Sequence, residues 1–252
     1  MTRVEEAKNH VNNILERFSN EISYSISNTM EHRGDIQISN KEKSNVMTIK
    51  MVDMDTVSAI FKYHNGKTAA LNFASYKNPG GGFIKGYMAQ EEALCHKSTL
   101  YPVLLSHNYY YDRNKGHLIR GLYTDAALYS KDILFMSETG NVKCDVITCA
   151  SPNWGAARRN GVSRAENTKV LKERIEFVLK VAALHDVDTL ILGAWGCGVF
   201  KQNPNEVAVL FQNALQKYPY FSTVIFAVPR GVNFDSFKGV FWLNRESYQR
   251  EK

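Results

Sequence analysis

Two kinds of hydrophobic pattern alternate along this chain of 252 residues. Short apolar runs predict β-strands, which we place at residues 47–52, 69–74, 133–136, 146–150, 189–194 and 223–228. Apolar residues at helical spacing predict amphipathic helices at residues 4–24, 170–184 and 206–217, and Asp55 can cap a further short helix. Strands that are apolar throughout are covered on both faces. The pattern therefore predicts an α/β protein, a three-layer α/β/α sandwich with an N-terminal helical extension.

The composition is that of an ordinary globular protein. No apolar run approaches the ~20 residues that span a bilayer, and the first residues lack the apolar segment of a secretory signal. We find no internal repeat and no Pro/Ser-rich linker, so we expect a single domain over residues 1–252, with residues 1–45 as a polar, helical extension. The four cysteines show neither paired nor metal-binding spacing. We therefore expect a cytoplasmic monomer with reduced thiols, no metal, no cofactor and no membrane association.

The formal net charge of +6 favours polyanionic ligands. The basic residues are nevertheless scattered, apart from Arg158 and Arg159, and no basic stretch is interleaved with aromatic residues. Proteins with a dedicated nucleic-acid groove usually gather their basic residues on one face. The charge thus suits a phosphorylated ligand without indicating dedicated nucleic-acid binding.

The most informative segment follows the predicted strand at residues 69–74. It reads Asn78, Pro79, Gly80, Gly81 and Gly82, followed after seven residues by Gln90, Glu91 and Glu92. Consecutive glycines let the backbone adopt positive φ angles and approach a ligand with no Cβ in the way. Neither half is specific alone, since glycine runs also form turns and Glu-Glu pairs are common on helix surfaces. Together they suit a sugar–phosphate ligand with a bond that is broken by proton transfer. A P-loop is excluded, because Phe83 and Ile84 follow the glycines where Lys and Ser/Thr are required.

A second glycine-rich loop follows the predicted strand at residues 189–194. It contains Gly193, Ala194, Trp195, Gly196, Cys197, Gly198, Val199 and Phe200. Open α/β sheets bind ligands at the carboxyl ends of their strands, where backbone amides and helix N-termini converge. Both loops leave such ends, so both are candidates for ligand contact. The alternative interpretation of the second loop is a tight turn before a helix.

These segments resemble the microbial type of the poly(ADP-ribose) glycohydrolase family, whose signature is Gly-Gly-Gly and Gln-Glu-Glu separated by six to eight residues. The resemblance extends to residues 71–75, 94–95, 98–102 and 192–200, and to Asn203 and Pro204. It implies a macrodomain-like mixed sheet. It also implies an enzyme that hydrolyses ribose–ribose O-glycosidic bonds and releases ADP-ribose, with an ADP-ribose polymer or an ADP-ribosylated protein as its substrate.

The resemblance implies a role for each residue of the two loops. Glu92 aligns with the catalytic acid, which would protonate the leaving 2′ oxygen and then accept a proton from the attacking water. Glu91 would contact a ribose hydroxyl, and Gln90 would steady the loop. Phe200 would pack on the terminal ribose. The other expected substrate-binding residues are Asn78, Gly80, Gly81 and Gly82 in the first loop and Gly196, Cys197, Gly198 and Val199 in the second.

Two alternative functions stay open at this point. One is the hydrolysis of single ADP-ribosyl groups, and the other is binding of ADP-ribose by a macrodomain without cleavage. Intact Glu91 and Glu92 argue against the pure binder, which has no use for an acid at the scissile bond. Lys85 and Tyr87 depart from the family pattern, since small or polar residues are expected there. They leave the choice of substrate open more than the reaction itself.

Overall fold

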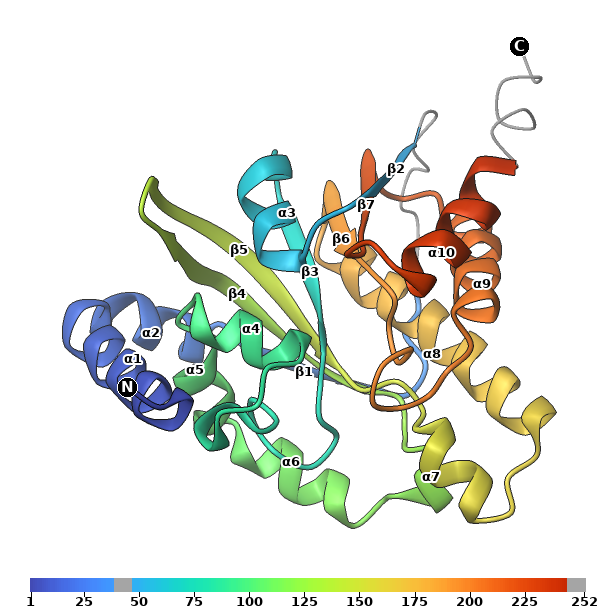
Figure 1. Cartoon of the computed structure of the whole chain (residues 1–252), viewed down its shortest axis with the longest axis horizontal. Helices are drawn as coiled ribbons and strands as arrows, with labels where there is room; N and C mark the ends of the chain where they lie inside the picture. The colour runs from blue at the N-terminus through green and yellow to red at the C-terminus, as the bar shows by residue number, and fades with distance from the viewer. Residues whose placement is uncertain (39–46, 244–252) are drawn as a thin grey trace.

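A seven-stranded mixed sheet forms the centre of the molecule in this computed structural model, which describes residues 1–38 and 47–243 (Figure 1). The strands are β1 (Met30–Arg33), β2 (Thr48–Val52), β3 (Thr68–Phe73), β4 (Ala126–Ser137), β5 (Gly140–Cys149), β6 (Thr189–Leu192) and β7 (Thr223–Ala227). Their order across the sheet is β1-β4-β5-β3-β6-β7-β2. Strands β5, β3, β6, β7 and β2 are parallel, whereas β4 runs antiparallel to both β1 and β5. The carboxyl ends of five strands therefore meet at one edge.

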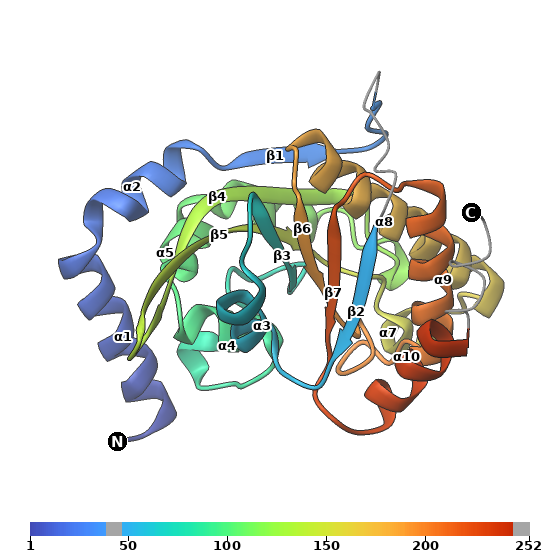
Figure 2. The same ribbon diagram turned by 90° about the horizontal axis from the view of Figure 1, so that it is seen from above.

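Helices cover the sheet on both sides (Figures 1 and 2). Those from the first half of the chain are α1 (Arg3–Arg17), α2 (Ser19–Ser27), α3 (Thr56–Tyr63), α4 (Gln90–His96), α5 (Leu100–Ser106) and α6 (Asn108–Lys115). Those from the second half are α7 (Trp154–Arg159), α8 (Arg164–Leu184), α9 (Pro204–Lys217) and α10 (Val232–Leu243). Two short 3-10 turns, η1 (Phe83–Lys85) and η2 (Ile119–Gly121), lie in the connections.

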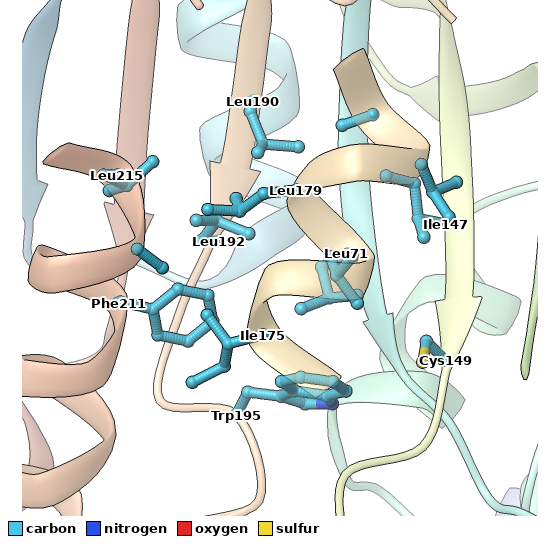
Figure 3. Close-up of a cluster of buried hydrophobic side chains, with 14 of the residues drawn as sticks. Leu71, Ile147, Cys149, Ile175, Leu179, Leu190, Leu192, Trp195, Phe211 and Leu215 are labelled. Atoms are coloured by element: carbon cyan, nitrogen blue, oxygen red, sulfur yellow. The ribbon is translucent and has the colours of Figure 1, made fainter. Parts of the chain in front are cut away.

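Alternate residues of the strands enter two separate cores. On β6, Leu190 and Leu192 pack with α8 and α9, where Figure 3 shows them beside Leu179 and Phe211. Ile191 between them belongs to the opposite core, which α1 to α6 cover. Because side chains point to alternate faces along a strand, the fully apolar strands require helices on both sides. The predicted sandwich of three layers is confirmed.

Most predicted elements are found close to their expected places. The strands expected at residues 133–136 and 146–150 are the ends of a longer hairpin formed by β4 and β5. Asp55 caps α3, since its Oδ1 accepts a hydrogen bond of 2.8 Å from the amide of Ser58. Predictions for residues 39–46, part of the expected extension, lie outside the described residues.

The continuous helix expected at residues 4–24 is wrong. Phe18 adopts φ −132° and ψ 33°, which ends α1 and starts α2 in a new direction. Ala7, Ile14 and Ile22 are buried, but Leu15 is 46% exposed although its spacing placed it on the apolar face. Two shorter helices can follow the curved edge of the core, where one straight helix would leave it. Nor is this region only helical, since β1 joins the sheet as an edge strand.

No helix among the described residues is long and apolar enough to cross a membrane.

Candidate active site

A cavity of about 490 Å³ opens at the edge where the parallel strands end. Its size is within the range of small-molecule sites. The carboxyl ends of β3 and β7 contribute Phe73 and Ala227, and the first turn of α3 contributes Thr56 and Val57. The second glycine-rich loop closes the opposite side. The cavity thus occupies the position at which open α/β sheets bind their ligands.

Gln90 ties three elements of the cavity wall together. Its Oε1 accepts from the amide of Phe73 at 2.8 Å, and its Nε2 donates to the carbonyl of Leu71 at 2.9 Å. The same Nε2 lies 3.1 Å from the Thr56 hydroxyl at the start of α3. These contacts hold the end of β3 against the first turns of α3 and α4. They agree with the prediction that Gln90 steadies the loop.

Glu92 is 5% exposed and fixed by two backbone amides. Gly82 donates to its Oε1 at 2.8 Å, and Ala89 donates to its Oε2 at 2.9 Å. A glutamate in the third position of a helix commonly reaches back in this way to the residue before the helix. Here the same carboxylate also holds the last glycine of the triplet, so the glycine loop and α4 fold as one unit.

Glu91 is 3% exposed and points in a different direction. Its Oε2 accepts from the amide of Ser75 at 2.7 Å, and its Oε1 accepts from Nδ2 of Asn72 at 3.2 Å. Burial raises the pKa of Glu91 to about 8, and the neighbouring Glu92 adds to the rise while the hydrogen bonds oppose it. Glu91 therefore keeps its proton at neutral pH.

The three glycines are required by three different neighbours. A Cβ at Gly80 would lie 2.6 Å from the Tyr101 ring, and one at Gly82 would lie 2.3 Å from the Tyr87 ring. A Cβ at Gly81 would lie 2.5 Å from Oε1 of Glu92 and 2.8 Å from Oε2 of Glu91. Gly81 also has φ +60°, which L-residues rarely adopt. The missing side chain of Gly81 lets both carboxyl groups pack against this glycine.

Several backbone amides of the second loop, whose residues line the cavity, donate no hydrogen bond within the described part of the chain. Amides without an acceptor among the described residues are those of Gly196, Gly198, Val199 and Phe200. Gly196 has φ +77°, and a Cβ there would lie 2.4 Å from the hydroxyl of Ser151. The carbonyl of Gly196 accepts from the amide of Gln202 at 3.0 Å, which fixes the far end of the loop. The residues of these four amides line the cavity, and free backbone amides in a loop can bind an anion without any charged side chain.

Phe200 lies at the end of this loop and lines the cavity. It packs edge-on against Tyr123 with 6.1 Å between ring centroids, and Tyr123 in turn stacks on Tyr76 at 4.0 Å. The carbonyl of Phe200 accepts from the amide of Gly155 at 3.1 Å. An aromatic wall therefore supports the Phe200 ring from behind.

The predicted site residues fall into two groups around this cavity. Those that line it are Gln90, Gly196, Gly198, Val199 and Phe200. Glu91 and Glu92 do not line it, but they belong to the same helical turn as Ala89 and Ala93, which do. Gly80, Gly81 and Gly82 surround these two carboxyls. Asn78 and Cys197 are outside the lining set; the Asn78 side chain is exposed, and its carbonyl accepts from the amide of Gly81 at 3.0 Å.

Several residues of the cavity were missed by the sequence reasoning. They are Asp55, Thr56 and Val57 after β2, Val228, Pro229 and Asn233 after β7, and Met88 in the first loop. The segment after β5 was also left without a role, yet Ser151 packs on Gly196 and the carbonyl of Pro152 accepts from Gln202 at 2.8 Å. The sequence did contain a signal for these residues, since each of these segments follows a strand of the parallel set, where open sheets bind their ligands.

Among the described residues, no group of three or more His, Cys, Asp or Glu side chains could hold a metal ion. Three of the four thiols, those of Cys95, Cys144 and Cys149, are fully buried, and all four cysteines are unpaired. Burial raises the pKa of Cys197 to about 12. The titratable groups placed to act on a ligand in the first loop are therefore the two carboxyls.

Comparison with known proteins assigns this arrangement to a family. The model of the microbial-type PARG catalytic domain matches residues 5–138. The poly(ADP-ribose) glycohydrolase of Thermomonospora curvata bound to the inhibitor ADP-HPD is 27% identical, with a TM-score of 0.80, over 94% of this chain and 98% of that chain. The poly(ADP-ribose) glycohydrolase of Deinococcus radiodurans in complex with ADP-ribose is 32% identical, with a TM-score of 0.74, over 90% of this chain and 98% of that chain. A search of the curated proteins finds no match. The chain belongs to the family of microbial-type poly(ADP-ribose) glycohydrolase catalytic domains.

Proposed function

We propose that this protein is a poly(ADP-ribose) glycohydrolase that hydrolyses ribose–ribose O-glycosidic bonds and releases ADP-ribose. The family match and the solved relatives, one with ADP-ribose and one with an inhibitor, support this activity. The site described above supports it independently, because it combines a cavity, a set of free amides and a pair of buried carboxyls.

The terminal ADP-ribose unit would occupy the cavity. Its diphosphate would accept hydrogen bonds from the free amides of Gly196, Gly198 and Val199, since backbone donors in a concave loop favour anions. The adenosine would then extend toward the residues after β2 and β7 that line the cavity, among them Val57, Val228 and Pro229. The terminal ribose would lie between Phe200 and the turn at Gly81.

In this arrangement Glu92 acts as the general acid. Its proton passes to the 2′ oxygen of the departing ribose as the bond from that oxygen to the anomeric carbon breaks. The carboxylate that remains stabilises the positive charge on the ribosyl group and accepts a proton from the attacking water. Acid–base assistance of this kind is worth roughly 10²- to 10⁴-fold in rate.

Glu91 has a different part in the proposal. With its pKa raised to about 8, it is neutral at physiological pH and can donate a hydrogen bond to a ribose hydroxyl. A neutral Glu91 also adds no negative charge beside the Glu92 carboxylate that forms when the proton has been transferred. The pair thus divides into one group that transfers the proton and one that positions the sugar.

One observation carries the proposal more than any other. Oε1 of Glu92 and Oε2 of Glu91 both lie against Gly81, because a Cβ at that glycine would be 2.5 Å from the first and 2.8 Å from the second. The two carboxyl groups therefore meet at one point of the first loop. A protein that only binds ADP-ribose has no need for such a pair.

The test incubates the wild-type protein with two substrates, poly(ADP-ribose) and mono-ADP-ribosylated protein, and measures the binding of free ADP-ribose separately. We expect release of ADP-ribose from the polymer. Release from the mono-ADP-ribosylated protein alone would favour the mono-ADP-ribosyl hydrolase. Binding of ADP-ribose without release from either substrate would leave the non-catalytic binder.

We also propose that the protein works as a cytoplasmic monomer with a macrodomain-like fold and without a dedicated nucleic-acid groove. The mixed sheet between two helical layers supports the fold type. Pairing of several arginines with acidic neighbours, as in Arg120 with Glu166, supports the last point, since it reduces the charge available to nucleic acid. Size-exclusion chromatography with light scattering tests the oligomeric state.

A further inference from the structure

Lys85 and Tyr87 stand on the outer side of the first loop. Both are exposed, and 63% of the surface of Tyr87 is accessible although it is a large aromatic residue. Lys85 forms no ion pair with any described residue. Neither residue lines the cavity, whereas Met88, the next residue along the chain, does. Neither residue has a role in the proposed reaction.

Their backbone is nevertheless fixed to the acid. The carbonyl of Gly82 accepts from the amides of Lys85 at 2.9 Å and Tyr87 at 3.1 Å, while the amide of Gly82 donates to Glu92 at 2.8 Å. The Tyr87 ring also packs against Gly82, since a Cβ there would lie 2.3 Å from it. Tyr87 is thus held beside Gly82, whose amide binds the glutamate, while most of its surface faces solvent.

The chemistry of the polymer decides what this ring meets. The leaving oxygen is on C2′ of an adenosine, next to the C1′ that carries the adenine. When the terminal unit fills the cavity, the departing nucleotide must begin at Glu92 and extend outside the cavity. Its base therefore lies near the acid on the outer side, where the exposed part of Tyr87 is found.

We propose that Tyr87 and Lys85 form a subsite for the nucleotide that leaves. Tyr87 stacks on the adenine of the second ADP-ribose unit, and Lys85 pairs with the diphosphate of that unit. This inference rests on the proposed function and specifies its substrate: a chain of at least two units. The first loop thus exposes an aromatic ring and, two positions away, a cation without an ion pair among the described residues. Aromatic rings and cations are the groups that bind bases and phosphates of single strands. A protein side chain as leaving group would offer neither partner.

The test uses two substrates that share one terminal unit. The first is the ADP-ribose dimer, and the second is a truncated dimer in which the terminal ADP-ribose is linked to the 2′ oxygen of a plain ribose. The variants are Tyr87→Ala, Tyr87→Phe as the conservative control, and Lys85→Gln. For each variant kcat/KM is measured on both substrates, and the Kd of ADP-ribose is measured to check that the cavity is intact.

We expect Tyr87→Ala to lower kcat/KM for the dimer by roughly five- to a hundredfold, the range that stacking on one base supplies. Tyr87→Phe should keep the wild-type value. Lys85→Gln should lower it less and remove part of its salt dependence. None of the three should change kcat/KM for the truncated dimer or the Kd of ADP-ribose.

Two results would overturn the subsite. An equal loss of kcat/KM on both substrates would mean that Tyr87 only shapes the loop around Glu92. No loss on either substrate would mean that the ring makes no important contact with the leaving nucleotide. Failure of the glycohydrolase proposal looks different, because wild-type protein would then cleave neither substrate, and the subsite would fall with it.

Discussion

Replacing Gly81 by alanine should separate the fold of the first loop from its chemistry. The added Cβ would lie 2.5 Å from Oε1 of Glu92 and 2.8 Å from Oε2 of Glu91, distances that real contacts do not show. Both carboxyls are held by backbone amides, so neither can move away without losing a hydrogen bond. The substitution therefore displaces at least one of the two carboxyl groups.

The size of the effect follows from two contributions. An alanine at φ +60° costs about 1–2 kcal/mol of backbone strain, because its Cβ is too close to the following carbonyl. Displacing a catalytic group by about 1 Å costs roughly 10²-fold in rate. We thus expect Gly81→Ala to lose about 1–2 kcal/mol of stability or somewhat more, and to lower kcat at least ~100-fold.

Gly161→Ala is the matched control for the strain. Gly161 has φ +74°, but a Cβ there would meet nothing within 4 Å. This variant should lose similar stability in urea unfolding and keep its kcat on poly(ADP-ribose). If Gly81→Ala kept wild-type activity, the packing of the two carboxyl groups against Gly81 would not matter for the reaction. If Gly161→Ala lost as much activity, the effect would be one of general destabilisation.

Three further outcomes are expected. Because the pKa of Glu91 is raised from 4.5 to about 8, the folded protein keeps a proton that the unfolded chain loses, so stability falls as pH rises through this window. Glu91→Gln should flatten that slope in urea melts between pH 5 and pH 8; an unchanged slope would refute the assignment. Arg174→Met removes a buried guanidinium that pairs with the partly exposed Asp125 and donates to the carbonyls of Ala150 and Leu122. It should cost about 3 kcal/mol without lowering kcat, and a change below ~1 kcal/mol would contradict this. Phe200→Ala removes the ring that would pack on the terminal ribose. It should lower kcat/KM for the polymer roughly tenfold because the ribose is held less firmly, with Phe200→Tyr as the control.

Local features of the site could be predicted from the sequence, because their causes are local. Three consecutive glycines indicate a backbone that turns tightly or approaches a ligand closely. The residues after them predict the start of a helix. The apolar strands at residues 69–74 and 189–194 place both loops at the same edge of a parallel sheet. The helix break at Phe18 could not be read in this way, since it depends on the curvature of the core beneath it.

What the sequence could not supply is the convergence of segments far apart in the chain. Thr56 and Asn233 line one cavity although 176 residues separate them, and that contact depends on β2 lying beside β7 at the edge of the sheet. The different hydrogen-bonding environment of each glutamate was also out of reach. It depends on whether each carboxyl receives its hydrogen bonds from the Ser75 turn or from Gly82, which only the folded loop determines.

The most direct test of the central claim is the pairing of turnover and binding in Glu92→Gln. Glutamine has nearly the same shape but carries no transferable proton, and it can accept only one of the two amide hydrogen bonds that the glutamate accepts. Release of ADP-ribose from the polymer under single-turnover conditions should slow by roughly 10²- to 10⁴-fold, while the Kd of ADP-ribose stays near the wild-type value. Release at the wild-type rate would show that another group donates the proton, and would contradict the account.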